Sequence, residues 1–409
     1  MSASGDTSGL APSLVADDLP APTVQCHAAN LMPLPDGSLG CVWFGGTQEG
    51  VADISIWFSR QTTDGWSAPA RLSDDAERSE QNPILFNAPD GSLWLLHTAQ
   101  RSGHQDTAIV RWRRSTDGGA TWSEPAPLFA DAGIFVRQPV VVTPSHWLLP
   151  IFHCRSTPGL RWSGDHDDSA VMVSTDQGRT WTERAVPGSL GCVHMNIVAG
   201  HPTQGKAAEF QAFYRSRWAD HVYRSVSVDG GLSWSAPQPT ELPNNNSSIQ
   251  VVRLAHGPFA GQLAMVFNAV SAAQATERRV SLYDEIEGES EDGSDAAYAT
   301  PESGTAGTRS AFWGTPRAPM TLALSADDGL TWPLRVDLEV GDGYCMTNNS
   351  AEQRNRELSY PSLVQTADGT LHVAYTHHRQ RIRHLALSAT WLTQHLNAHL
   401  TPHPHGATA

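Results

Sequence analysis

Tyrosine, histidine and arginine side chains stand where several of the chain's β-strand patterns begin or end, and these residue types carry out proton transfer and anion binding. Tyr360 begins the run YPSLV, while His27 and His194 begin HAAN and HMN. Imidazole titrates near neutral pH, which suits a general acid or base. Arg215 and Arg317 lie beside other strand patterns, and a guanidinium group fits a carboxylate as a two-pronged donor. This combination indicates a pocket for a sugar that carries a carboxylate.

Polar residues also begin the remaining strand patterns, in a chain whose other strand positions are mostly apolar. Packing alone does not explain them, because burying an unpaired polar group is costly. We therefore expect amide and guanidinium groups to bind the substrate at these positions: Asn30, Gln81, Asn82, Arg137, Gln138, Asn196, Asn245 and Asn246. For the asparagines of the NNN run, the cap of a turn is an alternative interpretation.

Proton transfer in such a pocket also calls for a carboxyl group, and Glu49 and Asp53 lie in a loop expected at the same end of the molecule. His27 and His194 are not accompanied by a third ligand at metal-binding spacing. We therefore expect neither a metal nor a cofactor.

An internal repeat indicates the elements that position these residues. The frame Ser-x-Asp-x-Gly-x-x-Trp occurs four times, at 115–122, 174–181, 227–234 and 325–332, and an eroded copy ends at Trp66. In a turn between two strands, the Ser and Asp side chains hydrogen-bond backbone amides, Gly accepts a positive φ, and Trp covers the neighbouring unit. Copies separated by roughly 50 to 60 residues, apart from one longer gap, indicate units of the size of a propeller blade.

Short β-hairpins between these boxes divide the chain into six units. We therefore predict an all-β fold, a six-bladed β-propeller that forms a single domain over residues 12–392. The last unit is one strand short, and residues 12–19 are expected to supply that strand and close the ring. The fifth blade carries an acidic insertion at about 269–318, whose centre, 283–308, is expected to be mobile. Residues 1–11 are expected to be a flexible N-terminus and 393–409 a tail.

Propeller topology makes the position of the site predictable. The innermost strand of each blade starts at one end of the central axis, so the polar residues that open the blades should meet in one pocket. The boxes should then lie at the opposite end, with a structural role and no part in catalysis.

Composition narrows the classes of partner. The net charge of −15 argues against nucleic acid, which needs a basic face. No stretch approaches the ~20 apolar residues of a membrane span, so no membrane partner is expected. The five scattered cysteines suit reduced thiols in the cytoplasm, although a removed export signal would leave the same picture. The sequence carries no signal for the oligomeric state.

The boxes, the six units and the last unit, with Tyr360-Pro-Ser-Leu363 before an Asp-Gly hairpin and IRHLALSATWL at its end, make the chain resemble the sialidase superfamily. Within it, the chain resembles the bacterial sialidase-like proteins with BNR (Asp-box) repeats. The resemblance covers about residues 25–392. It implies a six-bladed propeller in which three arginines hold the substrate carboxylate, a tyrosine polarised by a glutamate attacks, and an aspartate protonates the leaving group. By position, Tyr360 resembles the nucleophile, and Arg215 and Arg317 resemble the second and third arginines.

Three positions depart from the family pattern. HAAN at His27 replaces an Arg-Ile-Pro motif, His194 stands where the family has the glutamate, and Glu49 and Asp53 are the nearest counterparts of the aspartate. The first hypothesis is an exo-acting glycoside hydrolase, with Tyr360 as nucleophile, Glu49 or Asp53 as acid/base and His194 polarising Tyr360. The second is a uronate lyase that uses His and Tyr for β-elimination. The third is a non-catalytic glycan-binding propeller.

Overall fold

The computed structural model describes residues 14–157, 160–201, 209–279, 281–283, 285–286 and 309–397. The expected flexible N-terminus, most of the acidic centre of the insertion and the residues after 397 lie outside this part of the chain. None of the helices in the described ranges is long and apolar enough to cross a membrane.

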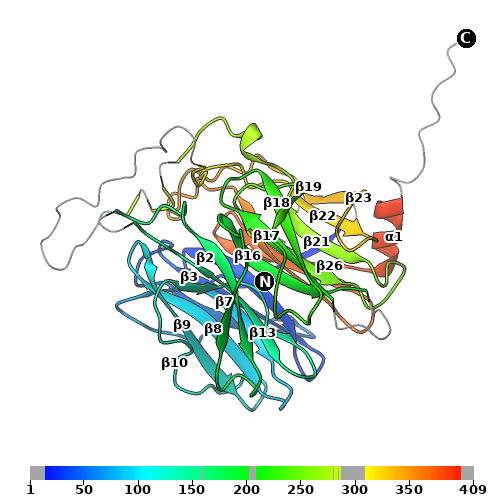
Figure 1. Cartoon of the computed structure of the whole chain (residues 1–409), viewed down its shortest axis with the longest axis horizontal. Helices are drawn as coiled ribbons and strands as arrows, with labels where there is room; N and C mark the ends of the chain where they lie inside the picture. Colours follow the sequence, from blue (N-terminus) through cyan, green and yellow to red (C-terminus); the bar gives the residue numbers. More distant parts are fainter. Residues whose placement is uncertain are drawn as a thin grey trace, which may run out of the picture.

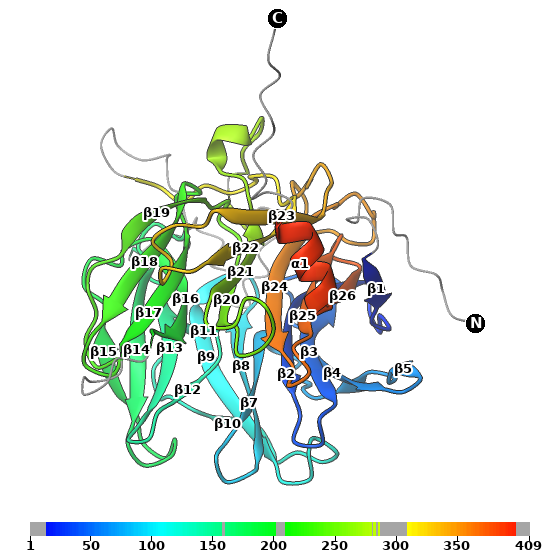
Figure 2. The same cartoon turned by 90° about the vertical axis from the view of Figure 1, so that its right-hand side faces the viewer.

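Six antiparallel sheets follow one another along the chain, and Figures 1 and 2 show them in order from blue to red. The first three sheets contain β2 (Gln25–Pro33), β3 (Leu39–Gly46), β4 (Ser55–Thr62), β5 (Gly65–Trp66) and β6 (Ala70–Arg71); β7 (Ser79–Asn87), β8 (Leu93–Arg101), β9 (His104–Ser115) and β10 (Ala126–Pro127); and β11 (Ile134–Val136), β12 (Val141–Val142), β13 (Trp147–His153), β14 (Asp168–Ser174) and β15 (Thr182–Ala185).

The other three sheets contain β16 (Cys192–Ala199), β17 (Phe210–Ser216), β18 (His221–Ser227) and β19 (Gln238–Pro243); β20 (Gln250–Arg253), β21 (Leu263–Asn268), β22 (Met320–Ser325) and β23 (Leu334–Glu339); and β24 (Leu358–Gln365), β25 (Leu371–His377), β26 (Arg381–Leu387) and β1 (Val15–Asp18). The predicted six-bladed β-propeller is confirmed.

Apolar side chains of neighbouring blades form the core between the sheets. Leu96 of β8 and Ile134 and Leu149 of the third blade, for example, belong to one buried cluster. Strand β8 reads LWLLHTAQR and is buried along nearly its whole length, as expected for a strand that is covered on both faces. The sequence forms strands here because its apolar runs are short and end at Asp-Gly turns such as the one at Gly91.

Strand β1 closes the ring, as predicted. It pairs antiparallel with β26 and supplies the fourth strand of the sixth blade, from Val15 opposite Ala386 to Asp18 opposite Arg383. The Arg383 side chain, which is buried, donates from Nε to Asp18 Oδ1 at 2.9 Å. The first residues described in the chain therefore join its last blade.

The boxes form the hydrogen-bonded turns that the repeat predicts. In the copy at 227–234, Ser227 Oγ donates to Asp229 Oδ1 at 2.8 Å and accepts from the amide of Gly231 at 2.8 Å. Asp229 Oδ1 accepts from the amide of Ser233 at 3.0 Å, and the Trp234 indole donates to the Gly231 carbonyl at 3.1 Å. The other three full boxes repeat the Ser and Asp hydrogen bonds, and the indole bond recurs at Trp122 and Trp181. The Trp332 indole nitrogen is buried and has no hydrogen-bond partner in the described ranges. None of the box residues lines the pocket described below.

β-Bulges open four of the six blades. The register of the first strand pair shifts where His27, Gln81, Val193 and Ser359 are each followed by a residue with positive φ. These residues are Ala28, Asn82, His194 and Tyr360, with φ of 59°, 50°, 55° and 52°. A left-handed conformation is unfavourable for residues other than glycine, and a bulge re-aims a side chain. The fold therefore holds these side chains in directions that a regular strand would not give.

The C-terminal region differs from the expected tail after residue 392. Helix α1 (Ala389–Asn397) continues past this point and packs beside β23, with Trp391, Leu392 and Leu396 buried in the core (Figure 2). The sequence analysis missed this helix because it spans only nine residues. Residues 398–409 lie outside the described part of the chain.

Candidate active site

A narrow pocket lies where the opening strands of several blades meet. Side chains of five blades and of the insertion line it: Glu49, Gln81, Asn82, Gln105, Phe135, Phe152, His194, Arg215, Arg217, Leu282 and Tyr360. Six of these residues belong to the set that the sequence analysis singled out. The structure thus brings the predicted Tyr360, His194, Glu49 and Arg215 to one pocket.

Tyr360 lies among three arginines. The guanidinium carbons of Arg137, Arg215 and Arg317 lie 5.4, 5.6 and 5.7 Å from the centroid of the Tyr360 ring. Arg215 Nη1 donates to the Tyr360 hydroxyl oxygen at 2.5 Å. A hydrogen bond from a cation stabilises negative charge on that oxygen.

Arg215 is the cation of this group that lines the pocket, and like Arg137 it has no carboxylate partner in the described ranges. Its side chain is 1% exposed, and its Nε donates to the amide oxygen of Asn246 at 2.8 Å. Burial lowers the pKa of Arg215 to about 10, and the cations Arg217 and Arg317 also disfavour its charge. Within the described ranges no carboxylate pairs with Arg215, whereas Arg217 pairs with Asp167 at 2.7 Å. A buried cation without a partner favours an anionic ligand.

Glu357, just before β24, balances the charges of two further arginines. Its carboxylate lies 3.1 Å from Arg317 Nη1 and 3.2 Å from Arg379 Nε, and it accepts from Ser359 Oγ at 2.6 Å. Burial opposes the charge of Glu357, but Arg317 and Arg379 outweigh this effect and hold the pKa of its carboxyl well below the ordinary value. The Arg317 guanidinium beside Tyr360 is therefore paired with the Glu357 carboxylate, unlike that of Arg215.

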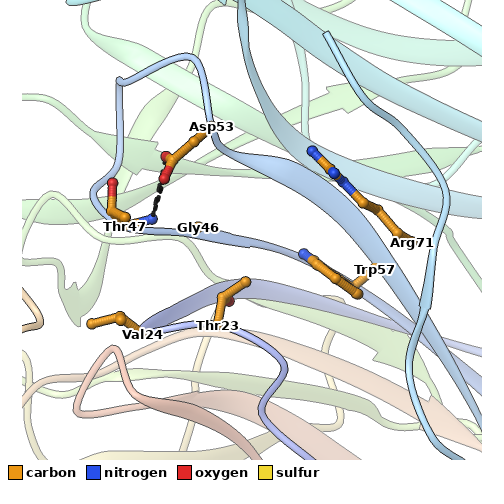
Figure 3. A pocket seen from close by; sticks show the side chains of 7 residues that line it. All are labelled: Thr23, Val24, Gly46, Thr47, Asp53, Trp57 and Arg71. Carbon is orange, nitrogen blue, oxygen red and sulfur yellow. Dashed lines mark hydrogen bonds between the residues drawn. The ribbon is translucent and has the colours of Figure 1, made fainter. Parts of the chain in front are cut away.

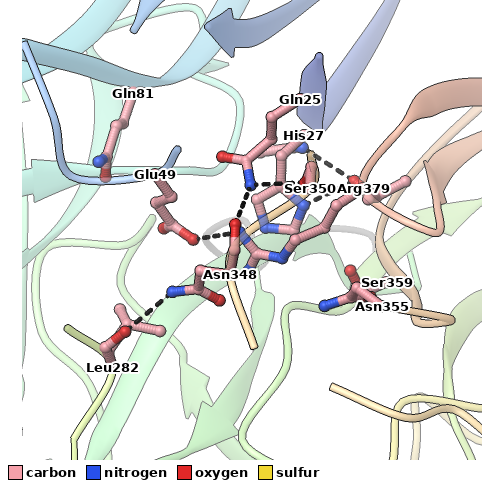
Figure 4. A network of polar contacts seen from close by, with 12 residues as sticks. Gln25, His27, Glu49, Gln81, Leu282, Asn348, Ser350, Asn355, Ser359 and Arg379 are labelled. Atoms are coloured by element: carbon pink, nitrogen blue, oxygen red, sulfur yellow. Dashed lines mark hydrogen bonds and ion pairs between the residues drawn. The ribbon is translucent and has the colours of Figure 1, made fainter. Parts of the chain in front are cut away.

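The two candidate carboxylates occupy different places. Glu49 lines the Tyr360 pocket and forms an ion pair with Arg379, whose Nη1 lies 2.6 Å from Glu49 Oε2 (Figure 4). Asp53 lies beside a separate pocket, where its Oδ2 accepts from the amide of Thr47 at 3.0 Å (Figure 3). Of the two, Glu49 is therefore the carboxylate placed near Tyr360.

The two histidines flank Tyr360 but differ in access. His194 lines the pocket, its ring centroid lies 5.7 Å from that of Tyr360, and its Nδ1 is 3.1 Å from Ser248 Oγ. His27 is fully buried behind Tyr360, with ring centroids 4.3 Å apart, and it is not among the residues lining the pocket. Its Nδ1 lies 2.9 Å from Thr376 Oγ1. Burial, together with nearby arginines, lowers the pKa of both histidines well below the ordinary value.

The family pattern suggested that His194 would polarise the Tyr360 hydroxyl, but the structure, which describes both side chains, shows no hydrogen bond between them. The hydrogen bond to that hydroxyl comes from Arg215. His194 therefore lines the pocket beside Tyr360 but does not polarise its hydroxyl, the role expected from the family's glutamate.

Three of the predicted substrate-binding amides join one blade to another: Asn30 and Asn196 bond the next blade, and Gln138 of the third blade bonds the start of the fifth. Asn30 Oδ1 accepts from a backbone amide of β7 at 2.9 Å, and Asn196 Oδ1 accepts from a backbone amide of β20 at 2.7 Å. Gln138 Nε2 donates to the backbone carbonyl just before β20 at 2.7 Å. Their polar groups are satisfied by the propeller itself, which explains why polar residues recur at the starts of these strands.

Arg137 lies under Tyr360 and holds the centre of the propeller together. Its Nη2 donates to the backbone carbonyls of Ala29 and Tyr360 at 3.0 and 3.2 Å, and its Nε donates to Ser248 Oγ at 3.3 Å. These contacts come from blades one and six and from the start of blade five. Arg137 was predicted to bind the substrate, but its guanidinium group donates its hydrogen bonds to protein atoms.

The remaining predicted amides divide between the pocket and the insertion. Gln81 and Asn82 line the pocket. Asn245 Nδ2 donates to the carbonyl of Pro316 at 2.8 Å, and Asn246 Nδ2 donates to that of Phe312 at 3.0 Å. The NNN run therefore anchors the returning end of the insertion.

The described ends of the insertion cover the pocket. Leu282 lines it, and the adjacent Tyr283, which is 2% exposed, accepts hydrogen bonds from Gln100 and Gln105 at 3.1 and 2.8 Å. Trp313, from the returning end, packs in the same buried cluster. Tyr283 was expected to lie in the mobile centre of the insertion, and this expectation was wrong because the side chain is buried against the second blade. Residues 287–308 lie outside the described ranges.

Sequence reasoning missed Glu357 and Arg379. Glu357 precedes the YPSL strand by only a few residues, which could have suggested a place near Tyr360. Arg379 lies in the turn between β25 and β26, with φ of 55°, and carries no such signal. In the described ranges no three His, Cys, Asp or Glu side chains gather in a way that could hold a metal ion.

The comparisons with known proteins agree with this architecture. Residues 37–373 match the BNR repeat-like domain family, and the chain therefore belongs to that family. The fold is that of sialidases, in which such repeats form the blades of a propeller.

Individual relatives are distant. A sialidase from Micromonospora viridifaciens is 23% identical over 360 residues, which cover 76% of this chain and 51% of that protein, so the chain spans about half of its length. A leech intramolecular trans-sialidase complexed with 2,7-anhydro-Neu5Ac has a TM-score of 0.65 at 10% identity, covering 95% of this chain and 72% of that one. A protein of unknown function from Dyadobacter fermentans has a TM-score of 0.63 at 14% identity, covering 92% and 99%.

Proposed function

We propose that the protein is an exo-acting glycoside hydrolase of the sialidase type that acts on glycans ending in an acidic sugar, either a ulosonic or a uronic acid. The observation that carries the proposal is Arg215, a buried guanidinium without a carboxylate partner in the described ranges, hydrogen-bonded to the hydroxyl of Tyr360 at 2.5 Å. Tyr360, Arg215 and Glu49 line the same pocket, so the three groups can act on one bound sugar.

The reaction begins with the sugar carboxylate bound to Arg215. The Tyr360 oxygen then attacks the anomeric carbon as its phenolic proton passes to solvent, and the glycosidic bond breaks, which gives a covalent sugar–tyrosine intermediate. Arg215 and the nearby Arg137 and Arg317 stabilise negative charge on the attacking oxygen. Water then releases the sugar and restores Tyr360.

Glu49 is the residue proposed for proton transfer. It gives a proton to the leaving oxygen in the first step and takes one from the attacking water in the second. Its support is its place in the lining of the same pocket as Tyr360, where its carboxylate is oriented by Arg379. Asp53 has no part in this mechanism because it lies beside the other pocket.

A uronate lyase is the second candidate, and the neutral histidines favour it. In this reaction Arg215 would neutralise the carboxylate, an uncharged imidazole would remove the proton at C5, and Tyr360 would protonate the leaving oxygen. Burial keeps the pKa of His194 and His27 low, so that each is available as a neutral base. We rank hydrolysis first for two reasons. His27 does not line the pocket, and Arg215 donates a hydrogen bond to the Tyr360 oxygen, which stabilises negative charge on a nucleophile.

A screen of oligosaccharides that end in sialic, other ulosonic or uronic acids tests the proposal. Two signals are followed together: new reducing ends and the ultraviolet absorbance of an unsaturated uronate. Hydrolysis gives reducing ends without absorbance, whereas elimination gives both. Binding without either signal would leave a glycan-binding propeller as the function. The Tyr360→Phe protein is the control for contaminating activity.

A further inference from the structure

Ser248 connects the central arginine to a histidine of the pocket. Its hydroxyl oxygen lies 3.3 Å from Arg137 Nε on one side and 3.1 Å from His194 Nδ1 on the other. All three side chains are buried, with exposures of 0% for Ser248 and 3% for each of the other two. The three groups form a short relay from the floor of the propeller to the wall of the pocket.

The direction of this relay follows from the donors that each group carries. Arg137 Nε has a single hydrogen and no lone pair, so it donates and Ser248 Oγ accepts. The Ser248 hydroxyl keeps its own hydrogen to donate, and within the described ranges the acceptor beside it is His194 Nδ1. The opposite arrangement, with Nδ1 donating, would leave a buried hydroxyl hydrogen without a partner, which is costly.

The charge state of His194 decides how many hydrogens its ring nitrogens carry. Burial and four arginines, Arg215, Arg217, Arg137 and Arg317, lower the pKa of its imidazole well below the ordinary value. A neutral imidazole carries one hydrogen, and Nδ1 is occupied as an acceptor. The hydrogen therefore resides on Nε2, the nitrogen that Ser248 does not hold.

We propose that Ser248 is a positioning residue that fixes the Nε2–H tautomer of His194, so that His194 donates a hydrogen bond to an acceptor oxygen of the bound sugar. The second half of this statement rests on the proposed function, whereas the tautomer does not. A sugar with a carbonyl, hydroxyl or ring oxygen at this point is accepted, and one that presents an ammonium group is rejected. With Nε2 protonated, His194 is also unsuited to remove a proton from a sugar.

Nitrogen NMR on the full-length protein tests the tautomer without any ligand. Histidine is labelled with ¹⁵N, and the signals of His194 are assigned by their loss in a His194→Gln variant. The expected spectrum at neutral pH has a hydrogen-bearing Nε2 and a bare Nδ1. A hydrogen on Nδ1, or on both nitrogens, would overturn the proposal even if the protein cleaves an acidic glycan.

Two serine variants isolate the role of Ser248. Ser247→Ala is the matched control, because the neighbouring Ser247 hydroxyl is equally buried and has no hydrogen-bond partner among the described residues. Ser248→Ala is expected to mix the two tautomers, and Ser248→Thr to restore the Nε2–H form. A spectrum of Ser248→Ala identical to that of the wild type would show that Ser248 does not set the tautomer, which contradicts the proposal.

The sugar-binding half is tested on the substrate found in the screen. Ser248→Ala is expected to raise KM by about twofold, because a mixture of tautomers leaves roughly half of the molecules with the Nε2–H donor, and Ser247→Ala is expected to leave KM unchanged. An unchanged KM in Ser248→Ala would refute the donor role. If no acidic sugar binds although Nε2 carries the hydrogen, the proposed function fails and the tautomer stands.

Discussion

Tyr360 and Glu49 are the two residues whose loss should be most damaging under hydrolysis. Tyr360→Phe removes the nucleophile, and Glu49→Gln removes the proton donor and acceptor, so each should lower kcat by at least the ~10²-fold expected of acid–base catalysis. His194→Ala should cost less, because His194 only donates a hydrogen bond. The kcat and KM of the three variants are to be measured on one substrate. Full activity in Glu49→Gln together with an inactive His194→Ala would exclude hydrolysis in favour of elimination.

At this scale the sequence could identify the residue types of the site but not which of them face the pocket. Asn30, Asn196 and Gln81 all follow the same pattern of a polar residue at the start of a strand. The first two bond the backbone of neighbouring blades, and Gln81 lines the pocket. The difference arises from bulges and from contacts between blades, which local sequence does not encode. The pairing of Glu357 with Arg379 is made within the sixth blade, where the start of β24 lies beside the turn between β25 and β26.

The boxes are elements for which the sequence and the structure indicate the same role, that of a turn that stabilises the fold. In Asp229→Ala the turn loses its acceptors for the amides of Leu232 and Ser233, which should lower the free energy of unfolding by about 1–3 kcal/mol. Turnover per folded molecule should persist, because no box residue lines the pocket. Urea denaturation and an assay of the folded fraction check both statements. Lost turnover at an unchanged melting temperature would show that the boxes do more than hold the fold.

The box carboxylates should also make the protein sensitive to acid. Hydrogen bonds from Thr121 and Thr180 lower the pKa of Asp117 and Asp176 to about 2. A carboxyl group whose pKa is lower in the folded state stabilises the protein above its unfolded pKa of about 4, and this contribution is lost as pH falls through the folded value. The melting temperature should therefore drop between about pH 4 and pH 2. In a double Asp117→Asn, Asp176→Asn variant this drop should be smaller, and an equal drop would contradict the assignment.

For the whole molecule, the closure of the ring by β1 was predictable, because a blade with three strands would leave an exposed edge. Asp18 fastens this strand through Arg383, which is 1% exposed. Asp18→Asn should lower the melting temperature, since a buried guanidinium loses a charged partner. Asp17→Asn is the matched control on the same strand, because the Asp17 side chain is 60% exposed. Equal melting temperatures for the two variants would argue that the ring closes without this ion pair.

The insertion marks the limit of what the sequence could reveal about the whole molecule. Its acidic composition predicted mobility, but its ends, at Leu282 and Trp313, are buried over the pocket. Apolar residues at the borders of a polar segment are too few to form a pattern, so their packing became visible only with the second and third blades in place.

The central claim is that Arg215 binds the carboxylate of a sugar, and calorimetric titration with matched ligands tests it most directly. Sialic, other ulosonic and uronic acids are each compared with their neutral carboxamides, in the wild type and in Arg215→Gln. A charge-assisted hydrogen bond is worth about 1.5–3 kcal/mol, so the wild type should bind one of the acids roughly 10- to 100-fold more tightly than its amide. In Arg215→Gln this preference should disappear. Equal affinity of the wild type for acid and amide, or a preference that survives in Arg215→Gln, would contradict the account.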